Sequence, residues 1–210
     1  MAFRFVVCSA GMILILAALG SFGKPGSDPW LIPPAGAEGA ITSRTSQGDL
    51  MQHYGEPNVR DADVDIGEGE TEPGTVLFPG DSQREIWILW KDADRKRFPK
   101  SIQIFGKRSL WKTAHGITLG SSLKDLERLN GRPFSLMGFE WDYGGTVMSW
   151  KGGALEDVKS GHVIVRLSPP SDDTPNPEIN KVAGESEFSS SDPTMQKINP
   201  RVYHIVWQFP

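Results

Sequence analysis

Two stretches of the sequence have the periodicity of a short amphipathic helix. In 117–133, leucines recur at every third position and form one apolar stripe, made of Leu123, Leu126 and Leu129. Hydroxyls of Thr45-Ser46 and Ser121-Ser122 can cap the starts of the two helices, and Gly131 followed by Pro133 is typical of a helix end. Seven of the 17 residues of 41–57 are identical to those of 117–133 at a constant offset of 76 (117 − 41). This match indicates a duplicated unit.

Alternation of apolar and polar residues predicts β-strands elsewhere. Residues 139–143 alternate aromatic and acidic side chains, and Gly144-Gly145 is a two-residue hairpin signal. A hairpin over 139–150 would bury one face, formed by Phe139, Trp141, Tyr143, Thr146, Met148 and Trp150. The other predicted strands are 85–91, 101–105, 162–167 and 202–209.

Together these elements predict an α+β fold built from two tandem repeats, 41–115 and 116–210. Each repeat is a short helix followed by antiparallel strands, and the helices are too short to be stable unless they lie on one face of the sheet. Within the second repeat, 168–200 is polar and contains six prolines. That composition predicts a long surface loop.

The N-terminus has the pattern of a targeting signal. Arg4 precedes an apolar run over 5–19, which is shorter than the roughly 20 residues that span a bilayer. We therefore expect a cleaved signal peptide over 1–23, with an uncleaved membrane anchor as the alternative. The next segment, 24–40, is rich in Pro and Gly and reads as a tether. Within it, Trp30–Ile32 either docks on the folded part or stays free.

Composition narrows the function further. Cys8 is the only cysteine and lies in the predicted signal, so the mature chain is expected to have no disulfide and no thiol nucleophile. Without 1–23 the chain keeps 21 basic residues (22 − 1) against 26 acidic ones, a balance of −5. This balance disfavours nucleic acid as a partner, because a general nucleic-acid binder carries a basic face.

The acidic stretch 61–72 has carboxylates at loop positions 1, 3, 5 and 12, as calcium-binding loops do. Ile66 stands where such loops carry a glycine, so a solvated acidic loop and a weak calcium site both stay open. The four histidines lack metal-ligand spacing, and no serine lies in a nucleophile turn. We therefore predict no catalytic residue, no metal ligand and no cofactor.

Strand 85–91 has apolar residues on both of its faces. Three of them match the buried side: Ile86, Ile88 and Trp90. Trp87 and Leu89 point toward the side that is expected to be polar. Either another segment covers this pair, namely the tether or the 168–200 loop, or the pair is a partner-binding surface. In the second case Trp87 is the expected anchor, because tryptophan is prominent among interface hot spots.

Several short motifs resemble the SmpA/OmlA (BamE-like) module, which also occurs in tandem in the β-lactamase inhibitory protein. The matching residues are Gly116, Ile117, Thr118, Gly120, Gly131, Pro133, Trp141 and Tyr143. The resemblance covers about 41–167, although the first half carries Arg44 at the position of Gly120. It implies a helix-and-sheet module of the cell envelope that binds other proteins.

The sequence thus predicts a secreted or periplasmic, non-catalytic module that binds proteins or serves as a structural part of the envelope. Its expected partner is another envelope or secreted protein, contacted through Trp87 and Leu89, with membrane contact only through the N-terminal signal or anchor. The alternative is a hydrolase or small-ligand-binding protein with a site between the two repeats. Convergent His and Asp or Glu in a pocket would favour that alternative.

Overall fold

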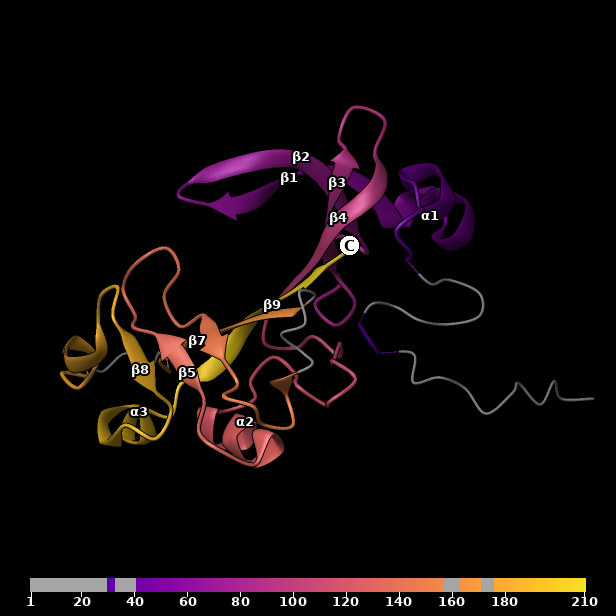
Figure 1. Ribbon diagram of the computed structural model, residues 1–210. Coiled ribbons are helices and arrows are strands. Elements are labelled where there is room, and N and C mark those ends of the chain that lie inside the picture. The colour runs from indigo at the N-terminus through magenta and orange to yellow at the C-terminus, as the bar shows by residue number, and fades with distance from the viewer. Residues whose placement is uncertain (1–29, 33–40, 157–162, 171–175) are drawn as a thin grey trace, which may run out of the picture.

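The computed structural model describes residues 30–32, 41–156, 163–170 and 176–210, so the predicted signal peptide and most of the tether lie outside the described residues. A six-stranded antiparallel sheet forms the body of the molecule (Figure 1). Its strands, in spatial order, are β1 (Val59–Gly67), β2 (Glu70–Leu77), β3 (Ile86–Asp92), β4 (Arg97–Phe105), β9 (Arg201–Gln208) and β7 (Val163–Ser168). All four strands expected from the sequence outside 139–150 are therefore present.

The remaining elements are short. The helices are α1 (Gln47–Tyr54), α2 (Leu123–Asn130) and α3 (Pro193–Ile198), with 3-10 turns η1 (Glu56–Asn58) and η3 (Ile179–Val182). A second, three-stranded sheet has the order β6 (Val147–Ser149), β5 (Ser135–Met137), β8 (Glu187–Ser189). The predicted α+β class is confirmed. Among the residues described, no helix has the length and apolar character needed to span a membrane.

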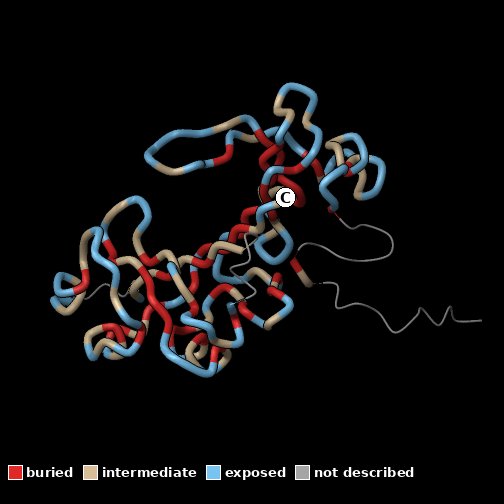
Figure 2. The backbone as a smooth tube through the Cα atoms, in the orientation of Figure 1, coloured by how far each residue is buried: buried red, intermediate tan, exposed pale blue. Residues whose placement is uncertain are grey.

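The core lies between the helices and one face of the large sheet. Alternate residues of β3 and β4 enter it, and Figure 2 shows buried residues both at the centre of the molecule and in the second half of the chain. Its fully buried members include Ile86, Ile88, Trp90, Ile102, Ile104 and Ile205 from the sheet, with Leu50, Leu123, Leu126 and Met195 from the helices. Trp87 and Leu89 therefore belong to the opposite face of the sheet, as the alternation predicts.

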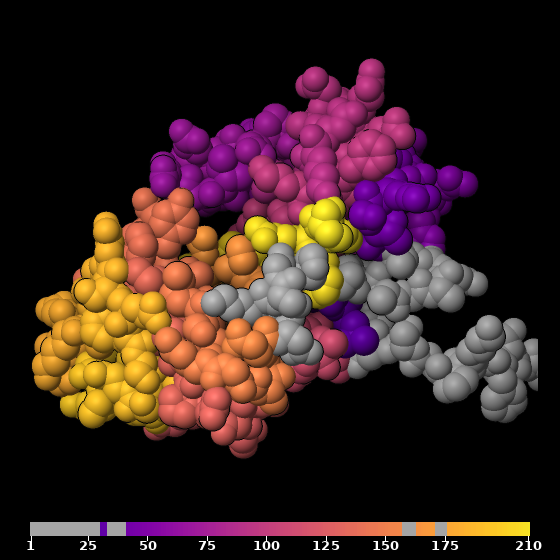
Figure 3. Space-filling view, viewed as in Figure 1, coloured from indigo at the N-terminus to yellow at the C-terminus, as the bar shows by residue number. Residues whose placement is uncertain are grey.

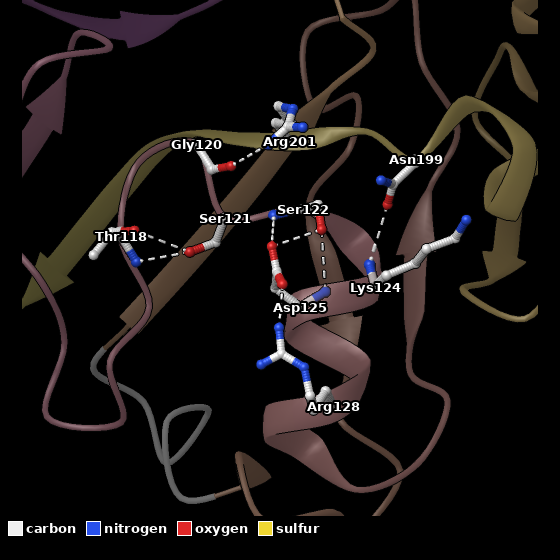
Figure 4. A network of polar contacts seen from close by, with 9 residues as sticks. All are labelled: Thr118, Gly120, Ser121, Ser122, Lys124, Asp125, Arg128, Asn199 and Arg201. Atoms are coloured by element: carbon white, nitrogen blue, oxygen red, sulfur yellow. Dashed lines mark hydrogen bonds and ion pairs between the residues drawn. The ribbon is translucent and has the colours of Figure 1, made fainter.

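Both predicted helix starts are capping boxes. Ser46 and Ser122 each accept a hydrogen bond from the backbone three residues on, and the Asp at that position binds back to the serine N–H. At α2 the first two backbone N–H groups of the helix are hydrogen-bonded as well. The Leu123 N–H donates to the Pro200 carbonyl. The Lys124 N–H donates to Asn199 Oδ1 (Figure 4). The start of α2 is thereby fixed to the junction of α3 and β9.

The tether segment Trp30–Ile32 docks on the folded part. Its backbone forms two hydrogen bonds with Lys112, and the Trp30 ring meets Trp111 edge-on at 5.5 Å between ring centroids. Ile32 is only 3 % exposed and belongs to the core. Of the two possibilities left open by the sequence, docking is the one observed.

The predicted hairpin over 139–150 is wrong. Within this stretch, regular pairing is confined to β6, which pairs with β5, and 138–146 is an irregular loop. Tyr143 in the loop and Met148 on β6 lie at the surface, with 40 % of each exposed. Gly145, at φ +69°, is pressed against the backbone of β7, where a Cβ would lie 1.7 Å from the Leu167 carbonyl oxygen. This glycine thus serves a close backbone approach between elements, which competes with the two-residue turn.

The stretch 168–200 is not a structureless loop, since the longer of its two described parts, 176–200, contains η3, β8 and α3. Apolar anchors hold this part in place, because Val182 and Met195 are at most 1 % exposed. Asp192 caps α3 by accepting from the Thr194 and Met195 N–H groups. The polar composition concealed these isolated apolar positions, which have no repeating period to reveal them.

Candidate functional site

The face of the sheet opposite the helices carries a polar and aromatic floor. It is continuous across the junction between the two halves of the chain, because Gln103 pairs with Val206 and Phe105 pairs with His204 across β4 and β9. On β7, Ile164 and Arg166 extend the same face, opposite Val206 and His204. Side chains on this face therefore come from both halves.

A cleft of about 400 Å³ lies over this floor. One wall is the tip of the β1–β2 hairpin, Asp65–Gly69, and the opposite wall includes Asp142, Arg166 and Tyr203. Figure 3 shows the two walls as the purple hairpin and the orange part of the second half, which meet at one side of the molecule. The volume lies within the range of about 300–1,000 Å³ that is typical of ligand sites.

The hairpin reaches the cleft because it leaves the sheet halfway along its length. Pairing of β2 with β3 ends at Gly74, and Pro73 before it has no N–H to continue the ladder. A side chain at Gly74 would lie 2.5 Å from both the Ile88 carbonyl oxygen and a methyl group of Val64. The glycine therefore lets Val64, only 1 % exposed, fold inward over the sheet.

A buried polar chain links the hairpin to both central strands. The Gln103 side chain donates to the Asp65 carbonyl oxygen at 3.2 Å, and its Oε1 lies 3.2 Å from His204 Nε2. The Phe105 ring stacks on the imidazole at 4.1 Å between centroids. Burial, with a smaller contribution from the Arg166 charge, lowers the pKa of His204 to about 3. The imidazole is therefore neutral at pH 7 and donates to Gln103 through Nε2.

At the mouth of the cleft the two walls touch. The Tyr143 hydroxyl donates to Glu68 Oε1 at 3.0 Å, which raises the pKa of Tyr143. The Arg166 guanidinium lies over the Tyr143 ring at 5.6 Å and donates from Nη1 to the Asp142 carbonyl at 3.5 Å. Its Nε has no hydrogen-bond partner among the described residues. Among the described residues, the bond between the Tyr143 phenol and the Glu68 carboxylate thus joins one wall to the other.

The described polar side chains of this cleft interact through hydrogen bonds and ring stacking. His204 is engaged by Gln103 and Phe105, and Asp65 Oδ1 accepts the N–H of Gly67. His204, Asp65 and Asp142 all line the cleft. Convergent His and Asp side chains in a pocket are what we expected of the alternative, a hydrolase or a small-ligand-binding protein. Within the described ranges, however, neither carboxylate of Asp65 and Asp142 is hydrogen-bonded to the imidazole.

Of the two predicted contact residues, one is accessible and one is not. Leu89 is 4 % exposed and lies at the floor of the cleft. Trp87 is half-buried on the same face, and its indole N–H donates to Glu85 at 3.0 Å. The segment that folds over this face is the β1–β2 hairpin, which is neither of the two covering segments that the sequence analysis named.

The acidic stretch 61–72 forms most of that hairpin. Carboxylates at alternate positions followed by a glycine-containing turn, Gly67–Gly69, are also typical of a β-hairpin. The sequence analysis considered only a calcium-binding loop or a solvated acidic loop here. Asp61 binds Lys96 and Gln47, while Glu72 pairs with Lys100, so these acids already have protein partners. No three His, Cys, Asp or Glu side chains among the described residues are close enough to hold a metal ion.

A second, more apolar hollow of about 630 Å³ lies beside the cleft. Phe105 and Tyr203 line both, and Leu119 and Pro169 line the second alone. Phe105 and Tyr203 are 37 % and 41 % exposed, so the rim between the two hollows is aromatic. No protein-family model, curated protein or solved structure matches this chain.

Proposed function

We propose that this chain is a non-catalytic binding module that holds a segment of another protein in the cleft on the free face of its sheet. The observation that carries the proposal is the continuity of that face across both halves, with accessible aromatic side chains along it. Trp87 lies half-buried at one side of the Gln103–His204 floor, and Phe105 and Tyr203 form the rim at the other.

The chemistry of the rim supports a protein partner. Aromatic side chains that are partly exposed bring large apolar area at low entropic cost, and the neighbouring Gln103, Arg166 and Asp142 offer hydrogen bonds for specificity. The N-terminal apolar run supports a location in the periplasm or outside the cell. The partner would then be a second envelope or secreted protein.

The duplication of the fold is also a proposal. The start of each helix bridges the start of a central strand, Ser46 to Arg97 of β4 and Ser122 to Arg201 of β9. Since β4 and β9 are antiparallel neighbours, this arrangement supports two related halves that meet at that pair. In such a duplication β3, which lies beside β4, would correspond to β7, which lies beside β9.

The test is site-directed photocrosslinking in extracts of the producing cells. A photoreactive phenylalanine at Tyr203 should yield a discrete crosslinked protein, and Trp87→Ala should reduce its yield at least several-fold. Met148→Ala is the matched control, because Met148 is 40 % exposed on β6 of the small sheet, whereas Trp87 lies beside Gln103 on the large sheet. Equal yields with Trp87→Ala and Met148→Ala would contradict binding at this face.

A small-ligand function is the second candidate, favoured by the enclosed polar part of the same cleft. His204, Gln103 and Arg166 converge there, and the unpartnered Nε of Arg166 marks a guanidinium whose donors are incompletely used in the described structure. Thermal-shift screening of small metabolites with the parent and with Arg166→Lys tests this candidate. A ligand that stabilises only the parent would favour it over protein binding.

A further inference from the structure

We propose that the outer part of the β1–β2 hairpin, residues 63–73, is a hinged arm that swings at Ala62 and Gly74 and is latched over the cleft by Tyr143. Opening of the arm is a property of the free chain. Only its role in admitting a partner rests on the proposed function.

The arm is not paired with the rest of the sheet, in contrast to the inner part of β2. From Gly74 to Leu77, β2 is paired with β1 on one side and with β3 on the other. From Pro73 to the tip of the hairpin, β2 is paired with β1 alone. A two-stranded ribbon by itself is marginally stable in water. The closed position therefore depends on what the arm touches across the cleft.

Those contacts are few and individually weak. Tyr143 donates to Glu68 at the tip, Gln103 donates to the Asp65 carbonyl at the middle, and Lys100 pairs with Glu72 at 3.1 Å near the base. Val64 is the single fully buried apolar side chain among the arm residues. Regions with few buried contacts open locally without global unfolding, so the arm is expected to open before the sheet does.

The hinge and the latch lie at opposite ends of the arm. At the hinge, Gly74 is indispensable, because a Cβ there would lie 2.5 Å from the Ile88 carbonyl oxygen and from Val64. At the latch, the Arg166 guanidinium over the Tyr143 ring holds the phenol in place from the second half of the chain. Closing the arm thus couples a segment of the first half to a residue of the second.

Hydrogen exchange on the full chain tests the latch. Tyr143→Phe removes the donor and Glu68→Ala removes the acceptor, so each should make the amides of 63–73 exchange about fivefold faster, the factor that a typical net hydrogen bond contributes. The double variant should exchange no faster than either single variant, because all three lack the same bond. Amides of the β4–β9 pair should keep the parent rate.

Two matched controls accompany these variants. Tyr203→Phe removes a hydroxyl from the same cleft, and Glu70→Ala removes a carboxylate from the arm itself. Neither group has a bond to the opposite wall in the described structure. Both should keep the parent rate in 63–73. Unchanged exchange in Tyr143→Phe, equal acceleration in Tyr203→Phe, or acceleration that spreads to β4 and β9 would each overturn the latch.

The crosslinking experiment then separates the latch from the proposed function. If the arm admits the partner, Tyr143→Phe should raise the crosslinked yield at position 203 by about the same fivefold factor. Faster exchange with an unchanged yield would overturn the gating role alone. Faster exchange with no crosslinked protein in any variant would count against the proposed function and leave the arm in place.

Discussion

At the scale of single residues, His204 is the side chain whose protonation is most changed by the fold. In the sequence it is one of four scattered histidines, and nothing distinguishes it. In the fold it is 6 % exposed, stacked on Phe105 and bonded to Gln103, so the protonated form would lose most of its solvation. Its role is to stay neutral and to join β9 to β4 and to the hairpin.

This burial predicts a pH dependence of stability. Because the pKa of His204 falls from 6.5 to about 3, the unfolded chain binds a proton in this range that the folded chain does not. The contribution of neutral His204 to the free energy of unfolding is therefore fully present above pH 6.5, and it is lost as the pH falls toward the pKa of the folded state. Urea unfolding should show a loss of up to about 1.4 kcal/mol per pH unit between roughly pH 6 and 5.

His204→Gln should reduce that slope, since the amide can still bond to Gln103 but cannot titrate. His53→Gln serves as the control, because His53 is exposed and its ring lies edge-on to Tyr54. A slope in His204→Gln equal to that of the parent would show that another group is responsible.

At the scale of elements, the two capping boxes share one sequence pattern but differ in setting. Ser122 is 6 % exposed, and its box sits where α2 meets Pro200, Asn199 and Arg201. Hydrogen bonds from Ser122 and the neighbouring Arg128 lower the pKa of Asp125 to about 2. Ser46 is more accessible, so water can replace its cap more readily.

Ser122→Ala should therefore cost about 1–2 kcal/mol of unfolding free energy, at the upper end for a lost N-cap. Ser46→Ala should cost about 0.5–1 kcal/mol, because its donors face solvent once the cap is gone. Chemical denaturation of the two variants beside the parent measures both values. Equal costs would mean that the junction with α3 and β9 adds nothing to the cap.

At the scale of the whole molecule, the β4–β9 pair joins the two halves into one sheet. Ile104 and Ile205 are directly opposite each other in this pair, and both are at most 1 % exposed. The last strand of the chain therefore completes a sheet begun by the first half. Such an arrangement favours a single cooperative unit over two independent domains.

Ile104→Ala and Ile205→Ala should each lower the free energy of unfolding by about 2–5 kcal/mol while the transition stays single. Circular dichroism and tryptophan fluorescence should give coincident urea transitions, since tryptophans lie in both halves. A second transition that either substitution leaves unmoved would show that the halves unfold separately.

Local patterns were sufficient for the elements whose signal lies within a few residues. The caps at Ser46 and Ser122 and the strands with buried alternate residues all followed from spacing and capping chemistry, which depend on near neighbours. The same reasoning failed for 139–150, because Gly145 is required by the distant Leu167 carbonyl. It also missed β1 and β2, because the alternating carboxylates of 61–72 were compared with a calcium-binding loop and not with a strand.

The sequence alone determined the α+β class, the helix starts, and the two-sided apolar character of 85–91, because each is set by contacts along one element. Tertiary structure decided that the hairpin folds over the face carrying Leu89, that β9 returns to pair with β4, and that His204 lies buried between them. The last two features join residues about a hundred positions apart in the chain, as His204 and Gln103 are (204 − 103 = 101), and the first joins residues of strands that are not neighbours in the sheet. No local period or spacing encodes such a meeting, so the cleft emerges only once the sheet is assembled.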